Sequence, residues 1–266
     1  MLDTIGTVIL YPTLGLCAIA AAVLVYRHDL YDREPLPLLG LTVALGAGAI
    51  GLAGHAEEWT FAALRLASPG SIAAVVALLE ELGKLAVVTT IALLARRAFN
   101  DPMDGIIYGS MAGLGMAVEE SVYCLRGSTA KVLPPEELVR ICGHVVMGGV
   151  GGFALGMAQA RLRGWPLAIA GGFAAAVGLH FGWDWLALSS NARRFTEAQT
   201  GLAVALMLGG MLVYGALLTI ASHWSHALFA PAIPERLWDW GWPFDRRSRK
   251  RAGPPEPPWP PPPPRC

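Results

Sequence analysis

Apolar residues gather in seven long segments of this chain, and short connections separate them. The segments are 5–26, 36–54, 72–95, 105–125, 141–160, 165–188 and 201–221. Each holds about 19 to 24 residues, and a helix needs about 20 apolar residues to cross a bilayer. Only helices and closed barrels satisfy their backbone polar groups in lipid, and segments of this length indicate helices. The pattern therefore predicts an all-α fold, a polytopic membrane helical bundle with about seven transmembrane helices.

The composition agrees with a membrane protein and narrows its partners. Hydrophobic residues make up 54% of the 266 positions and charged residues only 15%, against roughly 25% charged residues in soluble domains. The formal net charge is zero, so no excess of positive charge would attract nucleic acid. We expect the lipid bilayer as the surroundings of this protein and no nucleic acid as a partner.

Basic residues in the connections predict how the chain is oriented. One side of the bundle collects Arg27, Arg33, Arg96, Arg97, Arg161, Arg163 and the basic residues of 246–251, and the other collects Arg65, Arg126, Lys131, Arg140, Arg193 and Arg194. The short loops alone nearly tie, and the C-terminal cluster decides the count. Because basic loops favour the cytoplasmic side, we expect a multi-pass protein of the cell membrane with its N-terminus outside and its C-terminus cytoplasmic.

The chain divides by composition into two parts. Residues 1–222 form the predicted transmembrane domain, and 223–266 form a Trp-, Arg- and Pro-rich tail. Trp238, Trp240 and Trp242 are typical of a segment at the membrane interface, and residues 254–264 are nearly all proline, which favours an extended, solvated chain. We expect the tail to be cytoplasmic and largely disordered, and its role stays open.

Two cysteines fall near helix ends on the same predicted side of the membrane. A disulfide between Cys124 and Cys142 would form if that side is oxidising. The alternative is that both are small, buried thiols, and the sequence does not decide between the two.

Four of the apolar segments carry ionisable residues, each of which costs roughly 2.5–3.5 kcal/mol inside a membrane when unpaired. They are Glu80, Glu81 and Lys84, then Glu119 and Glu120, then His144, and finally His180 and Asp184. Counting 1.5 Å per residue puts these five in the outer half of the membrane core: Glu80, Glu120, His144, His180 and Asp184. Each pair alone could be structural, such as an ion pair between Glu80 and Lys84. Their common depth in four segments predicts one shared site.

Two chemistries fit this set of carboxylates and histidines. A buried glutamate can act as general base on a water molecule, or histidine and carboxylate side chains can bind a divalent metal that activates the water. For the second case the sequence offers Glu120, His144 and His180 as ligands, with zinc as one such metal. The chain has no H-E-x-x-H and no G-x-S-x-G motif. The choice between one metal and none stays open.

Ordered motifs between about Tyr31 and Asp184 resemble the PrsW family of intramembrane proteases, within the group that includes the CAAX prenyl endopeptidases. They are Tyr31-Asp32-Arg33-Glu34-Pro35, Glu80-Glu81-Leu-Gly-Lys84, Asp101-Pro-Met-Asp104-Gly105-Ile-Ile-Tyr108-Gly109, Gly113-Leu-Gly115-Met116-Ala-Val-Glu119-Glu120-Ser121, His144-Val-Val-Met-Gly-Gly and His180-Phe-Gly-Trp-Asp184. The chain departs from the pattern at Met116, where the family has phenylalanine, and at Ser121, where it has asparagine.

The resemblance implies hydrolysis of a peptide bond in a membrane-anchored protein, such as an anti-sigma factor, near the outer face. It also selects Glu120 over Glu119 as the site residue. We expect Glu80 as general base with Glu81 beside it, although the order of these two stays open. Lys84 and Tyr108 would support the site, and His180 with Asp184 would polarise the scissile carbonyl.

Two other classes of function remain compatible with the sequence. A proton-coupled transporter also buries Glu, Lys and His residues, although the chain shows no convincing internal repeat. A non-enzymatic membrane assembly factor would use the proline-rich tail as a docking arm. Substrate identity and oligomeric state are open as well.

Overall fold

The structure is a computed structural model that describes residues 2–126, 128, 130, 132–190 and 195–229. Within these ranges the chain forms seven helices and no strand. The helices are α1 (Leu2–Tyr26), α2 (Leu36–Leu64), α3 (Pro69–Leu94), α4 (Pro102–Leu125), α5 (Pro135–Gln159), α6 (Trp165–Ser189) and α7 (Glu197–Phe229). The predicted all-α bundle is confirmed. The predictions for the tryptophans at 238–242, the basic cluster at 246–251 and the proline stretch lie outside the described residues.

Five of the seven helices are long and apolar enough to cross a membrane: α1, α2, α5, α6 and α7. The other two, α3 and α4, have comparable lengths of 26 and 24 residues. α3 carries Glu80, Glu81 and Lys84 near its middle, and α4 carries Asp104 near its start and Glu119 and Glu120 near its end. α5 also carries charged residues, but all of them lie within its first two turns and leave a long apolar stretch behind them.

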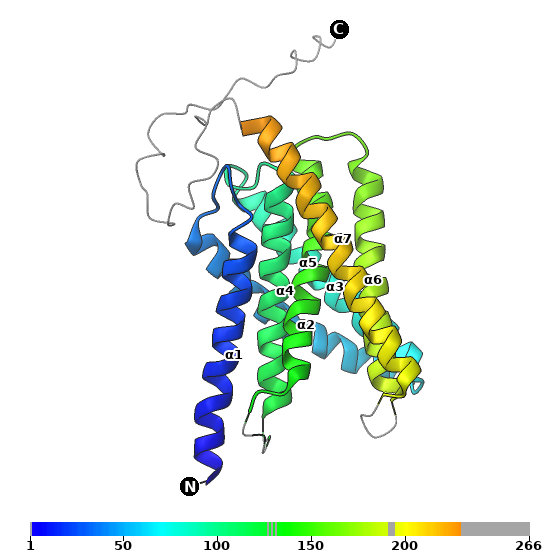
Figure 1. The fold of residues 1–266 in the computed structure, drawn as a ribbon. Helices are drawn as coiled ribbons and strands as arrows, with labels where there is room; N and C mark the ends of the chain where they lie inside the picture. The colour runs from blue at the N-terminus through cyan, green and yellow to red at the C-terminus, as the bar shows by residue number, and fades with distance from the viewer. Residues whose placement is uncertain (1, 127, 129, 131, 191–194, 230–266) are drawn as a thin grey trace.

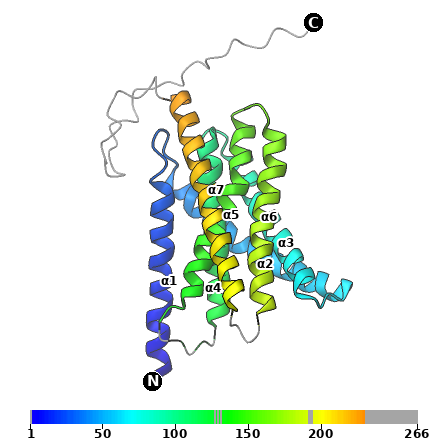
Figure 2. The ribbon, with the colours of Figure 1, turned by 45° about the vertical axis from the view of Figure 1, so that its right-hand side comes forward.

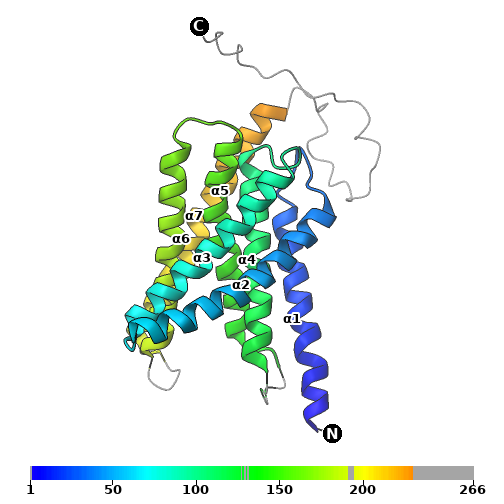
Figure 3. The same cartoon turned by 180° about the vertical axis from the view of Figure 1, so that it is seen from behind.

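The helices form an upright bundle crossed by an oblique pair. Figure 1 shows α4 and α5 in the middle, with α1 on one side and α6 and α7 on the other. Seen from behind, α2 and α3 cross the bundle at a steep tilt (Figure 3), and their connection reaches beyond the other helices (Figure 2). The start of α1 and the end of α7 lie at opposite ends of the bundle (Figure 1), as an odd number of crossings requires.

Glycines bring α4 and α5 into backbone contact at the centre. A Cβ added at Gly113 would lie 2.0 Å from the carbonyl oxygen of His144, and one added at Gly148 would lie 2.2 Å from that of Gly109. Any side chain at these positions would push the helices apart, since real contacts are never so short. The glycines therefore allow close packing of α4 and α5, and the contact fixes the height of His144 on α5.

Several helices begin with proline in the first turn, where the missing N–H costs nothing. Before α4, the side chain of Asp101 accepts hydrogen bonds from the backbone N–H groups of Met103 and Asp104, at 2.6 and 3.1 Å. This capping box satisfies donors that the helix itself leaves unpaired. It anchors the helix that carries Glu120 at its other end.

Three helices extend furthest past their predicted bounds, and two cysteines form no disulfide with each other. α2 continues ten residues past 54 to Leu64, α5 begins at Pro135 rather than 141, and α7 runs to Phe229, past the predicted domain boundary at 222. In the described part of the chain, Cys124 and Cys142 form no disulfide. Both residues stay thiols, but the expectation that they are buried is wrong, because Cys124 is exposed and Cys142 is half-buried.

Candidate active site

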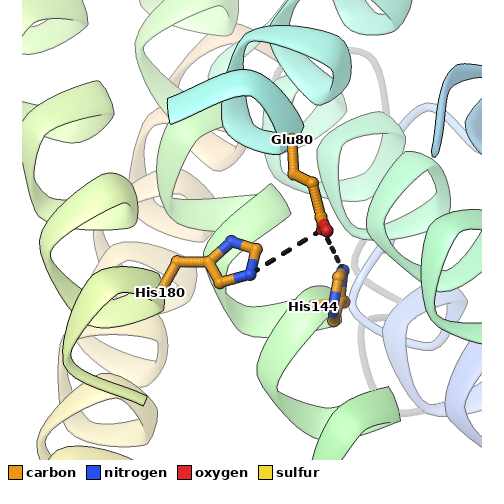
Figure 4. A group of neighbouring side chains, drawn as sticks. All are labelled: Glu80, His144 and His180. Carbon is orange, nitrogen blue, oxygen red and sulfur yellow. Dashed lines mark ion pairs between the residues drawn. The ribbon is translucent and has the colours of Figure 1, made fainter. Parts of the chain in front are cut away.

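Three buried side chains from three helices point at one another (Figure 4). The carboxylate oxygen Oε2 of Glu80 on α3 lies 3.9 Å from Nδ1 of His144 on α5 and 3.7 Å from Nε2 of His180 on α6. The two imidazole rings meet edge to face, with centroids 5.3 Å apart. One ligand atom from each residue lies within 4.8 Å of the other two. The cluster is therefore compact enough to share one small ligand.

A carboxylate fixes the second nitrogen of each histidine. Nε2 of His144 lies 3.1 Å from Oε2 of Glu120, and Nδ1 of His180 lies 2.8 Å from Oε1 of Glu81. A carboxylate accepts a hydrogen bond, so each of these nitrogens carries the proton. The opposite nitrogen of each ring then presents a lone pair toward Glu80.

This arrangement brings together acceptors without a donor between them. Oε2 of Glu80 and Nδ1 of His144 are buried and have no hydrogen-bond partner among the described residues. Buried polar atoms without partners are costly, and three facing acceptors repel one another. A cation between them removes both costs, and one carboxylate oxygen with two imidazole nitrogens is a donor set that zinc accepts. The residues present fit a divalent metal.

Two further carboxylates lie at the edge of the cluster. Oδ2 of Asp184 is 3.4 Å from Nε2 of His180, one helical turn away on α6, and has no hydrogen-bond partner in the part of the chain that the structure describes. Glu57 on α2 interacts electrostatically with Asp184, His180 and Glu120. The site therefore draws acidic groups from α2, α3, α4 and α6, and histidines from α5 and α6.

The adjacent glutamates of α3 have different surroundings. Glu81 forms a buried salt bridge with Lys84 and also contacts His180. Glu80 faces the two histidines with an unpaired oxygen. The sequence suggested an ion pair between Glu80 and Lys84. In the structure Lys84 pairs instead with Glu81, three residues before it. The negative charge of Glu81 is balanced, and that of Glu80 faces the cluster.

A comparison with family sequence models matches residues 34–214 to the model described as PrsW family intramembrane metalloprotease. The match covers more than half of the chain and includes every residue of the cluster. The chain belongs to this family. PrsW proteins are intramembrane peptide hydrolases, and the resemblance seen in the motifs is confirmed. The match also reaches into α7, beyond Asp184, where the motif resemblance ended. Comparisons with curated proteins and with solved structures give no significant match.

Arg140 and Glu137 also lie at the candidate site, although the sequence pattern did not predict them there. Arg140 on α5 places Nε 3.1 Å from Oε1 of Glu120 and also forms an ion pair with Glu137. Arg140 was counted as a loop charge because the predicted segment began at 141. Pro135 and the acidic first turn are helix-start features, and positions 137, 140 and 144 then share one helix face.

Glu57 was missed for a similar reason. The predicted second segment ended at 54, whereas α2 continues through this residue to Leu64. Buried Gly46 and Ala53 lie on the face that packs inward, and Glu57 follows Ala53 by four positions on that face. The helical period was a usable signal, but the apolar run alone did not show it.

Tyr108, predicted as a supporting residue, lies elsewhere in the structure. Its hydroxyl donates to Glu34 in the α1–α2 connection, and its ring stacks on Phe99. Twelve residues of α4 separate it from Glu120, which is about 18 Å along a helix. The two motifs around Glu34 and Asp104 thus form a second acidic cluster near the opposite end of α4. Glu119, as expected, faces away, and its carboxylate is 3.7 Å from Arg126.

Proposed function

We propose that this PrsW-family protein hydrolyses a peptide bond in a membrane-anchored protein at the cluster of Glu80, His144 and His180. One observation carries the proposal: an oxygen of Glu80 and one ring nitrogen of each histidine converge inside the bundle, and Oε2 of Glu80 and Nδ1 of His144 have no hydrogen-bond partner among the described residues. Such a site can hold a cation and a water molecule away from bulk solvent. The other activities considered from the sequence do not require this convergence.

We assign the metal ligands as Glu80, His144 and His180, which replaces the earlier assignment that used Glu120. A divalent ion such as zinc, when bound there, lowers the pKa of water and polarises a carbonyl group. Glu120 contacts the far nitrogen of His144, and carboxylates in that position orient a ligating histidine and raise its basicity. Glu120 therefore acts by orienting His144 and does not bind the metal itself.

The remaining residues hold and move protons around the cluster. Glu81, balanced by Lys84, keeps the proton on Nδ1 of His180, and Arg140 holds the carboxylate of Glu120. The unpaired Oδ2 of Asp184, 3.4 Å from Nε2 of His180, is available to accept a proton released by attacking water. Asp184 is thus the proposed general base, and Glu81 and Lys84 are positioning residues.

The substrate side of the proposal follows from where the cluster lies. Its residues are nearer to the end of the bundle where α3 and α5 begin and α4 and α6 end. The count of basic residues, which the C-terminal cluster at 246–251 decides, favours the outside for that end. We therefore propose a single-span, anti-sigma-factor-like protein that is cut near the outer face.

The test uses purified full-length protein in proteoliposomes with a panel of single-span substrate proteins. Glu80→Gln removes the converging charge and is expected to lower the cleavage rate at least about 100-fold. Glu119→Gln, the matched control next to Glu120, is expected to cleave like the wild type. Elemental analysis should find about one zinc per wild-type chain and much less in the Glu80→Gln variant. Equal cleavage by Glu80→Gln and the wild type would refute the proposal.

A further inference from the structure

A pocket of about 300 Å³ opens directly beside the candidate active site. At its polar end lie His144, His180 and Asp184. The rest of its lining comes mainly from the first halves of α5 and α7, the second half of α6 and the beginning of α3. Most of this lining is apolar, including Leu179, Leu206 and Met207. Pockets of this size that are apolar with a few convergent polar groups are typical of ligand sites.

We propose that this pocket is the specificity subsite, which receives a large aliphatic side chain of the substrate next to the bond that is cut. The inference rests on the proposed function, since it takes the ligand to be a membrane-anchored protein. Aliphatic side chains match the leucine and methionine walls. A charged side chain would be stripped of water against the aliphatic walls, which carry no charged group to pair with it.

Gly210 of α7 keeps the pocket open. This residue is buried, and a Cβ built on it would lie 3.4 Å from Cγ1 of Val146 and 3.6 Å from Cδ1 of Leu179. These are ordinary contact distances, so a methyl group fits without moving the helices. A longer side chain at position 210 would extend along the pocket lining and occupy the space meant for substrate.

The polar end of the pocket explains why a substrate can be cut inside the membrane. A helix must unwind before its peptide bond can be attacked, and lipid offers nothing to the backbone groups that unwinding frees. Arg140 and Glu120 line the pocket together with the histidines, so polar partners stand next to the apolar wall. An unwound substrate can therefore place its backbone on the polar side and its side chain on the aliphatic side.

Binding can be measured separately from cleavage by photo-crosslinking. The probe is a synthetic single-span peptide that carries photoreactive leucine at successive positions, added to full-length Glu80→Gln protein in proteoliposomes. We expect one position to crosslink to Leu206, Met207 or Leu179, mapped by mass spectrometry. Gly210→Leu should lower this crosslink about tenfold, and Gly210→Ala should lower it less.

Gly209→Leu is the matched control, because nothing lies within 4 Å of a Cβ at that neighbouring position. It is expected to leave the crosslink unchanged. Thermal unfolding of each variant shows whether Gly210→Leu is folded, and Gly210→Ala carries the test if it is not. An unchanged crosslink in the folded Gly210 variants, or a photoreactive lipid that labels these residues in place of the peptide, would overturn the inference. A pocket crosslink without any cleavage by the wild type would instead refute only the proposed function.

Discussion

Each histidine of the site contacts a carboxylate through the ring nitrogen that faces away from Glu80. Glu120 contacts the far nitrogen of His144 and is itself held by Arg140. Glu119, its neighbour in the chain, contacts Arg126 and is 44% exposed. A shift of one position along α4 therefore decides whether a glutamate contacts His144 or lies on the surface.

Glu120→Gln is expected to weaken metal binding about 10- to 100-fold, because a neutral amide supports the imidazole less well than a carboxylate. The measurement is a zinc competition titration with a chromophoric chelator, together with the cleavage rate. Glu119→Gln is the control and should bind zinc like the wild type. Equal affinities in both variants would show that Glu120 does not act through His144.

The second acidic cluster joins the α1–α2 connection to the start of α4, and it makes the stability of the fold depend on pH. Burial raises the pKa of the Asp29 carboxyl from 3.8 to about 8, and the nearby carboxylates of Glu34 and Asp101 add to the rise. The folded protein therefore holds a proton that the unfolded chain releases above about pH 4. The contribution of this group to stability is largest at low pH and is lost as the pH rises toward 8.

Asp29→Asn should flatten this dependence, because asparagine keeps an acceptor for the backbone N–H of Glu34 and cannot ionise. The slope of unfolding free energy against pH should become shallower by up to about 1.4 kcal/mol per pH unit between pH 5 and 8. Thermal unfolding in detergent across this range measures it. Glu136→Gln, at an exposed position at the start of α5, should keep the wild-type slope. A steeper slope in Asp29→Asn would contradict the assignment.

At the scale of elements, the contact between α4 and α5 sets the position of the site. A Cβ on Gly113 would lie only 2.0 Å from the carbonyl oxygen of His144. The two helices can approach only because both present glycines along this line. A change in their spacing would therefore move His144 relative to Glu80 on α3.

Gly113→Ala is expected to destabilise the protein by about 1–3 kcal/mol, the usual cost of overpacking, and to lower activity more than the loss of folded protein explains. Gly151→Ala on α5 is the control, because its Cβ would meet only Ala176 Cβ, at 3.8 Å. Unfolding midpoints and cleavage rates per folded molecule measure both effects. Wild-type stability in Gly113→Ala would show that the helices can separate without cost.

At the scale of the whole molecule, the sequence predicted the helices well because each has a continuous apolar run. It predicted the ends less well wherever polar site residues interrupt a helix. The predicted second segment ended before Glu57 and the predicted fifth segment began after Arg140, yet both residues proved to be half-buried partners of the site. Charged residues at a helix end are indistinguishable from loop residues until tertiary contacts are known.

The roles within the site depended on geometry that spacing cannot supply. Glu80 and Glu81 are adjacent in the chain, yet one faces both histidines and the other is bonded to Lys84. The rotation of α3 about its axis decides this, and no local pattern fixes that angle. Tyr108 was grouped with the site because its motif resembles the family, but α4 carries it to the opposite end of the bundle.

The orientation in the membrane is a last prediction for the molecule as a whole. The connections at Ser128 and Arg97 lie at opposite ends of α4 and α5, and both residues are exposed. If the positive-inside rule holds for this chain, Ser128 faces outward with the active-site end. In a background with the native cysteines replaced by alanine, an impermeant maleimide should label Ser128→Cys in intact cells. Arg97→Cys should be labelled only after the membrane is opened. The reverse pattern would place the site near the cytoplasmic face, and the substrate would then be cut on that side.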